Sequence, residues 1–148
     1  MAIPFFVYGT LLRGEANHTR FRGAIERLER ATLRGARLFD LGPYPMALET
    51  ANDADEIVGE LIWPVPSRAA HILKSLDRLE GVDGDNPTSR ASLFRRELRN
   101  ARIVGESDGE NAQNLVTCYV YFGRETAARR GRFIASGDWR ARFREKWS

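Results

Sequence analysis

The sequence predicts a single domain of the α+β class. Short apolar stretches with high strand propensity recur along the chain, and clusters of Gly, Pro, Asp and Asn separate most of them. One helix is clearly marked in the middle. Because helices interrupt the strands singly, instead of following each strand as in repeated βαβ units, the pattern is typical of an α+β protein. A chain of 148 residues is long enough for one domain, residues 1–148, with its own hydrophobic core.

The expected elements follow in order along the chain. A strand at residues 4–8 precedes a helix near residues 15–29. Further strands are expected at residues 31–39, 45–49, 56–64, 93–104 and 115–122, with the central helix between residues 67 and 81 and another helix at the C-terminus.

The end of the first strand is a candidate ligand-binding loop. Phe5 to Val7 are apolar and favour a strand, and Gly9 follows almost directly. A glycine lets the backbone approach a ligand without an intervening Cβ, so the amides after the strand can face a carboxylate or an oxyanion. The same pattern also occurs at ordinary strand ends, and the residues alone leave both interpretations open.

The central helix has recognisable limits. Ser67, after Pro66, can cap its start, and Gly81 can take the left-handed conformation at its end. At about 100° per residue, one face forms an apolar arc of Ala69, Ile72, Leu73, Leu76 and Leu79.

Glu80 falls inside that arc, between Leu73 and Leu76. A carboxylate on the buried face at a helix C-terminus is disfavoured by desolvation and by the helix dipole, so the pKa of Glu80 should rise. A carboxyl group with a raised pKa can act as a general base. The alternative is that Glu80 extends to solvent or pairs with an arginine; helix geometry alone does not decide between them.

The C-terminal segment, residues 124–148, carries eight basic and three acidic residues, although the whole chain has a net charge of only +3. Together with its aromatic residues, this charge could bind nucleic acid. Trp139, Phe143 and Trp147 recur at helical i, i+4, i+8 spacing, however. The spacing favours a helix docked on the domain, with solvated arginines, over a nucleic-acid site.

Composition indicates a cytoplasmic protein. No apolar run approaches the roughly 20 residues that span a bilayer, and the start Met-Ala-Ile-Pro does not resemble a signal peptide. The single Cys118 can form neither an internal disulfide nor a cysteine-based zinc site, so no metal or other cofactor is expected. The sequence does not predict an oligomeric state.

Short motifs spread over nearly the whole chain match one known family. The first is Phe6-Val7-Tyr8-Gly9-Thr10-Leu11, with Arg13-Gly14 and Asn17-His18. The others are Pro43-Tyr44-Pro45, Val58-Gly59-Glu60, Leu76-Asp77-Arg78-Leu79-Glu80-Gly81, Cys118-Tyr119-Val120-Tyr121 and Ser136-Gly137-Asp138-Trp139. In these motifs the chain resembles the γ-glutamylcyclotransferase-like (AIG2-like) family.

The resemblance implies a small mixed β-barrel flanked by helices and an enzyme that acts on a small γ-glutamyl substrate. The expected reaction converts a γ-glutamyl amine or γ-glutamyl amino acid to 5-oxoproline and a free amine. Glu80 matches the family's catalytic glutamate and would be the general acid and base.

The resemblance also implies a substrate-binding set. The backbone of Tyr8, Gly9, Thr10 and Leu11 would hold the glutamyl group, and Arg96 aligns with a family arginine. The Tyr8 side chain could contact the substrate or serve only in packing.

Two departures from the family pattern bear on this function. Phe94 replaces a tyrosine, and residues 82–93 form a longer segment after Gly81 that could be a lid or an ordinary surface loop. The departures leave an alternative: a catalytically silent metabolite-binding or interaction module of the same fold. The sequence does not identify the leaving amine.

Overall fold

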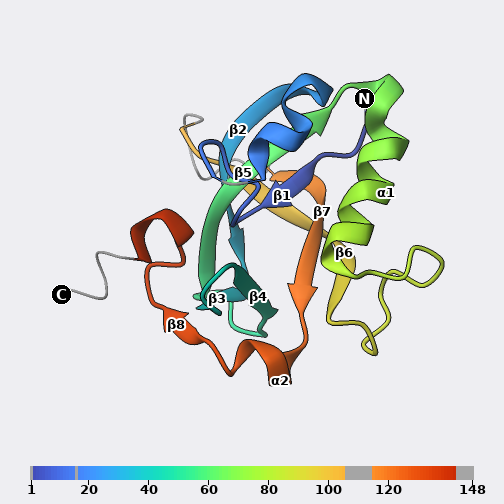
Figure 1. Cartoon of the computed structure of the whole chain (residues 1–148). Helices are drawn as coiled ribbons and strands as arrows, with labels where there is room; N and C mark the ends of the chain where they lie inside the picture. Colours follow the sequence, from blue (N-terminus) through green and yellow to red (C-terminus); the bar gives the residue numbers. More distant parts are fainter. Residues whose placement is uncertain (1, 16, 106–114, 143–148) are drawn as a thin grey trace.

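The computed structural model describes residues 2–15, 17–105 and 115–142 and consists of a closed five-stranded barrel with a smaller sheet beside one end (Figure 1). The strands are β1 (Phe5–Val7), β2 (Ile25–Arg34), β3 (Ala36–Asp40), β4 (Pro45–Glu49), β5 (Glu56–Pro64), β6 (Phe94–Ile103), β7 (Leu115–Gly123) and β8 (Arg132–Ile134). The helices are α1 (Ala69–Glu80), α2 (Glu125–Ala128) and the 3-10 turns η1 (His18–Ala24), η2 (Pro66–Arg68) and η4 (Trp139–Ala141).

The barrel mixes parallel and antiparallel pairing. Its strand order is β1-β5-β2-β6-β7, and it closes where β1 pairs in parallel with β7. The other neighbouring strands of the barrel are antiparallel. After β2 the chain leaves the barrel, and β3 pairs with β4 and β8 in the second sheet. The predicted α+β class and mixed barrel are therefore confirmed.

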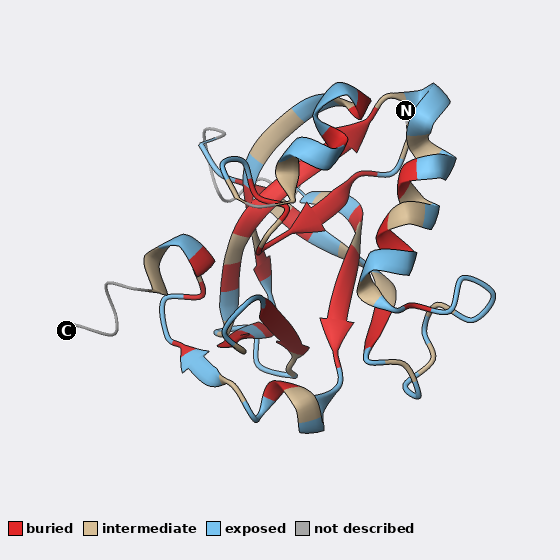
Figure 2. Ribbon diagram, viewed as in Figure 1, coloured by how far each residue is buried: buried red, intermediate tan, exposed pale blue. Residues whose placement is uncertain are grey.

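Buried residues concentrate on the barrel strands, whereas the outer surfaces of the helices are exposed (Figure 2). On β5, residues 59–64 are buried without interruption, which indicates that both faces of this part of the strand are covered. Helix α1 lies along the outside of the barrel, next to β6 and β7 (Figure 1).

The predicted strands at residues 45–49 and 56–64 are confirmed to the residue, but the helix near residues 15–29 is wrong. Among the described residues of this range the only helical turn is η1, and from Ile25 the chain enters β2, which pairs with β5 along its whole length. The strand predicted at residues 31–39 is two strands in different sheets. Pairing with a distant segment overrides local helical preference in this region.

The predicted C-terminal helix is described only at its start. Trp139 begins η4, is buried and donates from Nε1 to Glu15 Oε1 at 3.1 Å. Phe143 and Trp147 lie outside the described residues. The docking expected of Trp139 is therefore confirmed, whereas the longer helix stays a prediction.

Helix α1 ends at Glu80, and Gly81 directly after it has the predicted left-handed conformation, with a φ of 70°. Its start differs: Ser67 lies within the turn η2, and no side chain caps α1. The buried face is also rotated from the predicted arc, because Asp77 is buried and Leu79 is exposed.

Candidate active site

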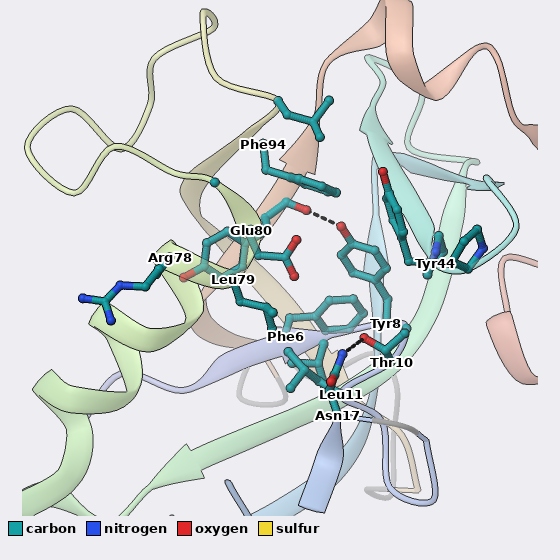
Figure 3. Close-up of a pocket in the computed structure, with 17 residues that line it drawn as sticks. Phe6, Tyr8, Thr10, Leu11, Asn17, Tyr44, Arg78, Leu79, Glu80 and Phe94 are labelled. Atoms are coloured by element: carbon teal, nitrogen blue, oxygen red, sulfur yellow. Dashed lines mark hydrogen bonds between the residues drawn. The ribbon is translucent and has the colours of Figure 1, made fainter. Parts of the chain in front are cut away.

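One cavity of about 520 Å³ lies where the end of α1, the loop after β1 and the turn before β4 meet (Figure 3). Its walls are mainly apolar and aromatic, as is common for small-molecule sites. The lining residues are Phe6, Val7, Tyr8, Gly9, Thr10, Leu11, Asn17, Pro43, Tyr44, Pro45, Arg78, Leu79, Glu80, Gly81, Leu93, Phe94 and Tyr121. Five of the six predicted site residues are thus brought together, and Arg96 is not among them.

Glu80 is the last residue of α1, and its carboxyl group points toward Tyr8 (Figure 3). Burial raises the pKa of this carboxyl from 4.5 to about 7, because the charged form loses its hydration. No ion pair between described residues includes Glu80. The side chain therefore neither pairs with an arginine nor behaves as an ordinary solvated glutamate.

Tyr8 is buried beside Glu80 and bridges three parts of the fold. Its hydroxyl donates to the Tyr121 carbonyl oxygen at 2.5 Å and accepts from the Ala47 amide at 3.4 Å. Burial, and then the nearby charge of Glu80, raises the pKa of Tyr8, so the phenol stays neutral. These bonds connect the loop after β1 to β7 and β4.

The loop after β1 has a compact backbone with amides that remain available. The Leu12 amide donates to the Gly9 carbonyl at 3.0 Å, and the Asn17 amide donates to the Thr10 carbonyl at 2.7 Å. The Asn17 side chain also donates to Thr10 Oγ1 at 2.9 Å. Within the described part of the chain, by contrast, the amides of Gly9, Thr10 and Leu11 have no hydrogen-bond acceptor.

Gly9 is required by a close contact with the cavity wall. A Cβ at this position would lie 2.5 Å from Cγ and 2.7 Å from Cδ of Pro45. Only glycine therefore lets the loop after β1 pack directly on the first residue of β4, and this packing closes one side of the cavity.

Asp77 locks the last turn of α1 to the barrel. Arg96 on β6 donates to its two carboxylate oxygens at 2.9 and 3.2 Å, and the Tyr121 hydroxyl on β7 donates to Oδ1 at 2.6 Å. Asp77 is only 6% exposed, and these three hydrogen bonds compensate for the hydration that its carboxylate loses on burial. We call these hydrogen bonds of Asp77 with Arg96 and Tyr121 the Asp77 lock. Because Asp77 and Glu80 are about one turn apart on α1, the Asp77 lock also sets the position of Glu80.

Sequence reasoning left Asp77 outside the site and did not select Tyr121. Tyr121 lies in one of the motifs that carried the family resemblance, which was the only available signal for it. Arg96, expected to contact substrate, instead binds Asp77 and stacks over the Tyr119 ring, with its guanidinium carbon 4.8 Å from the ring centroid.

The segment 82–93 is tied to the fold at several points. The Val82 amide donates to the Asp77 carbonyl, the Arg96 amide to the Pro87 carbonyl, and the Arg124 amide to the Leu93 carbonyl, at 2.8 to 2.9 Å. Leu93 at its end lines the cavity, and so does Phe94, which replaces the family tyrosine. The segment therefore contributes to the cavity through its C-terminal end.

Elsewhere, the structure offers no site for a metal among residues 2–15, 17–105 and 115–142: no group of three or more His, Cys, Asp or Glu side chains converges there. Burial raises the pKa of the Cys118 thiol to about 12, so the thiol is not activated as a nucleophile. None of the described helices is long and apolar enough to cross a membrane.

A family model described as gamma-glutamyl cyclotransferase, AIG2-like, matches residues 5–141. The chain belongs to this family. Membership in this family supports a γ-glutamyl cyclotransferase-like function. No curated protein matches the chain at a significant level.

Several solved structures have the same fold as this chain. An AIG2-like protein from mouse has a TM-score of 0.66 at 22% identity, over 92% of this chain and 88% of the mouse chain. YkqA from Bacillus subtilis has a TM-score of 0.63 at 21% identity; all of this chain is covered, but it spans only 44% of YkqA. A yeast gamma-glutamyl cyclotransferase specific to glutathione has a TM-score of 0.56 at 9% identity, over 82% of this chain and 68% of the yeast chain.

The Asp77 lock predicts unequal effects for two tyrosine substitutions on β7. Tyr121→Phe removes a hydrogen bond to a buried carboxylate, so the free energy of unfolding should fall by about 1.5–3 kcal/mol. Tyr119→Phe is the matched control, because among the described residues the Tyr119 hydroxyl has no hydrogen-bond partner; its effect should stay within about 0.5 kcal/mol. Urea denaturation measures both, and equal losses would contradict the lock.

Desolvation of Glu80 predicts a pH-dependent difference in stability between the wild type and Glu80→Gln. A carboxyl with a raised pKa in the folded state favours folding when protonated. This contribution to the free energy of unfolding is complete below pH 4.5, the pKa of the carboxyl in the unfolded chain. It is lost as the pH rises through about 7, the pKa in the folded protein. Over that interval the wild type should lose up to roughly 3 kcal/mol relative to Glu80→Gln.

Urea denaturation at several pH values measures this difference. Glu26→Gln, at an exposed position, is the control for loss of a carboxylate. Parallel stability profiles for the wild type and Glu80→Gln would show that Glu80 is not desolvated.

Proposed function

We propose that the protein is a γ-glutamyl cyclotransferase-like enzyme that converts a γ-glutamyl amine or γ-glutamyl amino acid to 5-oxoproline and the free amine. The observation that carries this proposal is the Glu80 carboxyl, whose pKa is about 7, in a cavity beside backbone amides that lack acceptors. Perturbed carboxyl groups of this kind are common among catalytic acids and bases.

Glu80 would transfer the protons that the reaction must move. Its carboxylate takes a proton from the substrate's α-ammonium group, and the resulting amine nitrogen attacks the γ-carbonyl carbon to form the bond that closes the lactam ring. The bond from this carbon to the leaving nitrogen then breaks, while protonated Glu80 returns the proton to that nitrogen. The regenerated Glu80 carboxylate removes the second proton from the ring nitrogen and passes it to the freed amine, so the lactam is neutral and the amine departs as an ammonium group. With a pKa of about 7, both forms of the carboxyl are well populated near neutral pH.

The loop after β1 would bind the glutamyl group. The amides of Gly9, Thr10 and Leu11 can donate to the substrate carboxylate or to the oxygen that becomes negative during attack. The nucleophile belongs to the substrate, so the enzyme's remaining task is to hold the amine near the carbonyl.

The other predicted residues receive indirect roles. The Tyr8 ring forms part of the wall, while its hydroxyl is engaged by Tyr121 and therefore supports the loop. Arg96 is a positioning residue, because it acts on Glu80 through Asp77. Phe94 supplies an apolar surface where the family pattern has a phenol.

The test is release of 5-oxoproline from a panel of γ-glutamyl amines and γ-glutamyl amino acids by the wild type and by Glu80→Gln. The substitution keeps the side chain's shape but removes the base, so turnover should fall at least about 100-fold. Binding should persist, and calorimetry with the same compounds measures it. Glu26→Gln controls for the loss of a carboxylate elsewhere.

Retained turnover in Glu80→Gln would refute the assigned role of Glu80. A folded wild type that binds γ-glutamyl compounds but releases no 5-oxoproline from any of them would instead support the alternative, a silent metabolite-binding module.

A further inference from the structure

We propose, on the basis of the proposed function, that the leaving group is an uncharged apolar amine and that an apolar collar of Tyr44, Leu79 and Leu93 binds it at the mouth of the cavity. The proposal names the substrate class within the γ-glutamyl compounds, which neither the family nor the catalytic residues specify.

The collar consists of three large apolar side chains that folding leaves exposed. Tyr44 is 38% exposed, Leu79 is 39% exposed and Leu93 is 43% exposed, and each lines the cavity that contains Glu80. They come from the turn between β3 and β4, from the last turn of α1 and from the end of the segment 82–93. Convergence of exposed apolar residues from separate segments around one opening indicates a binding surface.

Phe94 extends the collar inward. Its side chain is buried, lines the same cavity and lies 6.3 Å from the Tyr44 ring between centroids, at an interplanar angle of 51°. A continuous apolar surface thus runs from the mouth toward Glu80. The family tyrosine would place a polar hydroxyl in this position, so its replacement by Phe94 removes a polar group from this wall.

The charge around the cavity matches an uncharged leaving group. Arg78 and Glu80 are the only charged residues among those that line the described cavity. The guanidinium of Arg78 is directed away from Glu80 and Tyr8 (Figure 3). A carboxylate on the leaving amine would therefore meet apolar side chains, and burying it there without a partner would be costly.

The cavity has room for such a group, and the collar is held in place. Its volume of about 520 Å³ is in the range of sites for ligands considerably larger than a glutamyl group. Leu93 is fixed at the backbone by the Arg124 amide, Leu79 by its place on α1, and Tyr44 by the Leu41 amide, which donates to its carbonyl at 3.1 Å. The backbone that carries the collar is therefore fixed before substrate binds.

A homologous series of substrates measures the collar directly. We would compare the γ-glutamyl amides of methylamine, propylamine and pentylamine by 5-oxoproline release. Burial of each added methylene should raise kcat/KM by roughly threefold to fourfold. A matched pair, γ-glutamyl phenethylamide and γ-glutamylphenylalanine, differs only by one carboxylate, and the amide should be preferred at least about tenfold.

Two variants locate the effect. Leu93→Ser should lower the pentyl-to-methyl ratio of kcat/KM severalfold, because a polar side chain replaces part of the collar. Leu98→Ser is the control: Leu98 is 49% exposed on β6 but does not line the cavity, so the ratio should equal that of the wild type. Circular dichroism establishes that both variants are folded.

Calorimetry of the same series with Glu80→Gln separates this proposal from the proposed function. Affinity that rises with chain length supports the collar even if the wild type releases no 5-oxoproline, a result that refutes the reaction alone. Turnover that is equal along the series, or unchanged ratios in Leu93→Ser, overturns the collar and leaves the reaction standing. Preference for γ-glutamylphenylalanine that disappears in Arg78→Ala would also overturn it, since Arg78 would then bind a carboxylate.

Discussion

The buried carboxylate of Asp77 is the interaction on which the rest of the site depends. It joins three elements that are distant in sequence, because Arg96 comes from β6 and Tyr121 from β7, while Asp77 itself is on α1. A buried charge is tolerated only when its hydrogen-bonding capacity is satisfied, and removing one partner from such a network is expensive. This requirement selects one orientation of α1 on the barrel, and with it the position of the helix C-terminus.

Two carboxyl groups one turn apart on α1 therefore have opposite surroundings. Asp77 has a guanidinium and a phenol as partners, whereas Glu80 faces an apolar cavity where burial raises its pKa to about 7. A divergence of this kind within one site commonly separates a structural or electrostatic carboxylate from a proton-transfer group. The orientation of α1 that buries Asp77 also brings Leu79 to the mouth of the cavity. The hydrogen bonds of Asp77 to Arg96 and Tyr121 therefore position both the proposed base and part of the proposed collar.

Much of the architecture could be predicted from local patterns. Strands at residues 45–49 and 56–64 are bounded by clear turn signals. Periodicity placed Glu80 within the apolar arc of α1 but left open whether its side chain extends to solvent, and the family resemblance was needed to select it as the catalytic residue. The partners of Arg96 could not be predicted, because they depend on how α1, β6 and β7 meet in space. For the same reason Leu79 was expected in the core: the predicted arc counted only apolar residues, but Asp77 is buried through its polar partners. The wrong helix near residues 15–29 likewise reflects pairing of β2 with β5, which no local window contains.

The measurement that tests this account most directly is an NMR titration of the Glu80 carboxyl carbon in the wild-type protein, with Glu80→Gln used to assign its signal. Desolvation in the cavity predicts an apparent pKa of about 7. A value near the ordinary 4.5 would contradict the account, because a solvated carboxylate would be neither held in an apolar site nor suited to transfer protons in both directions near neutral pH.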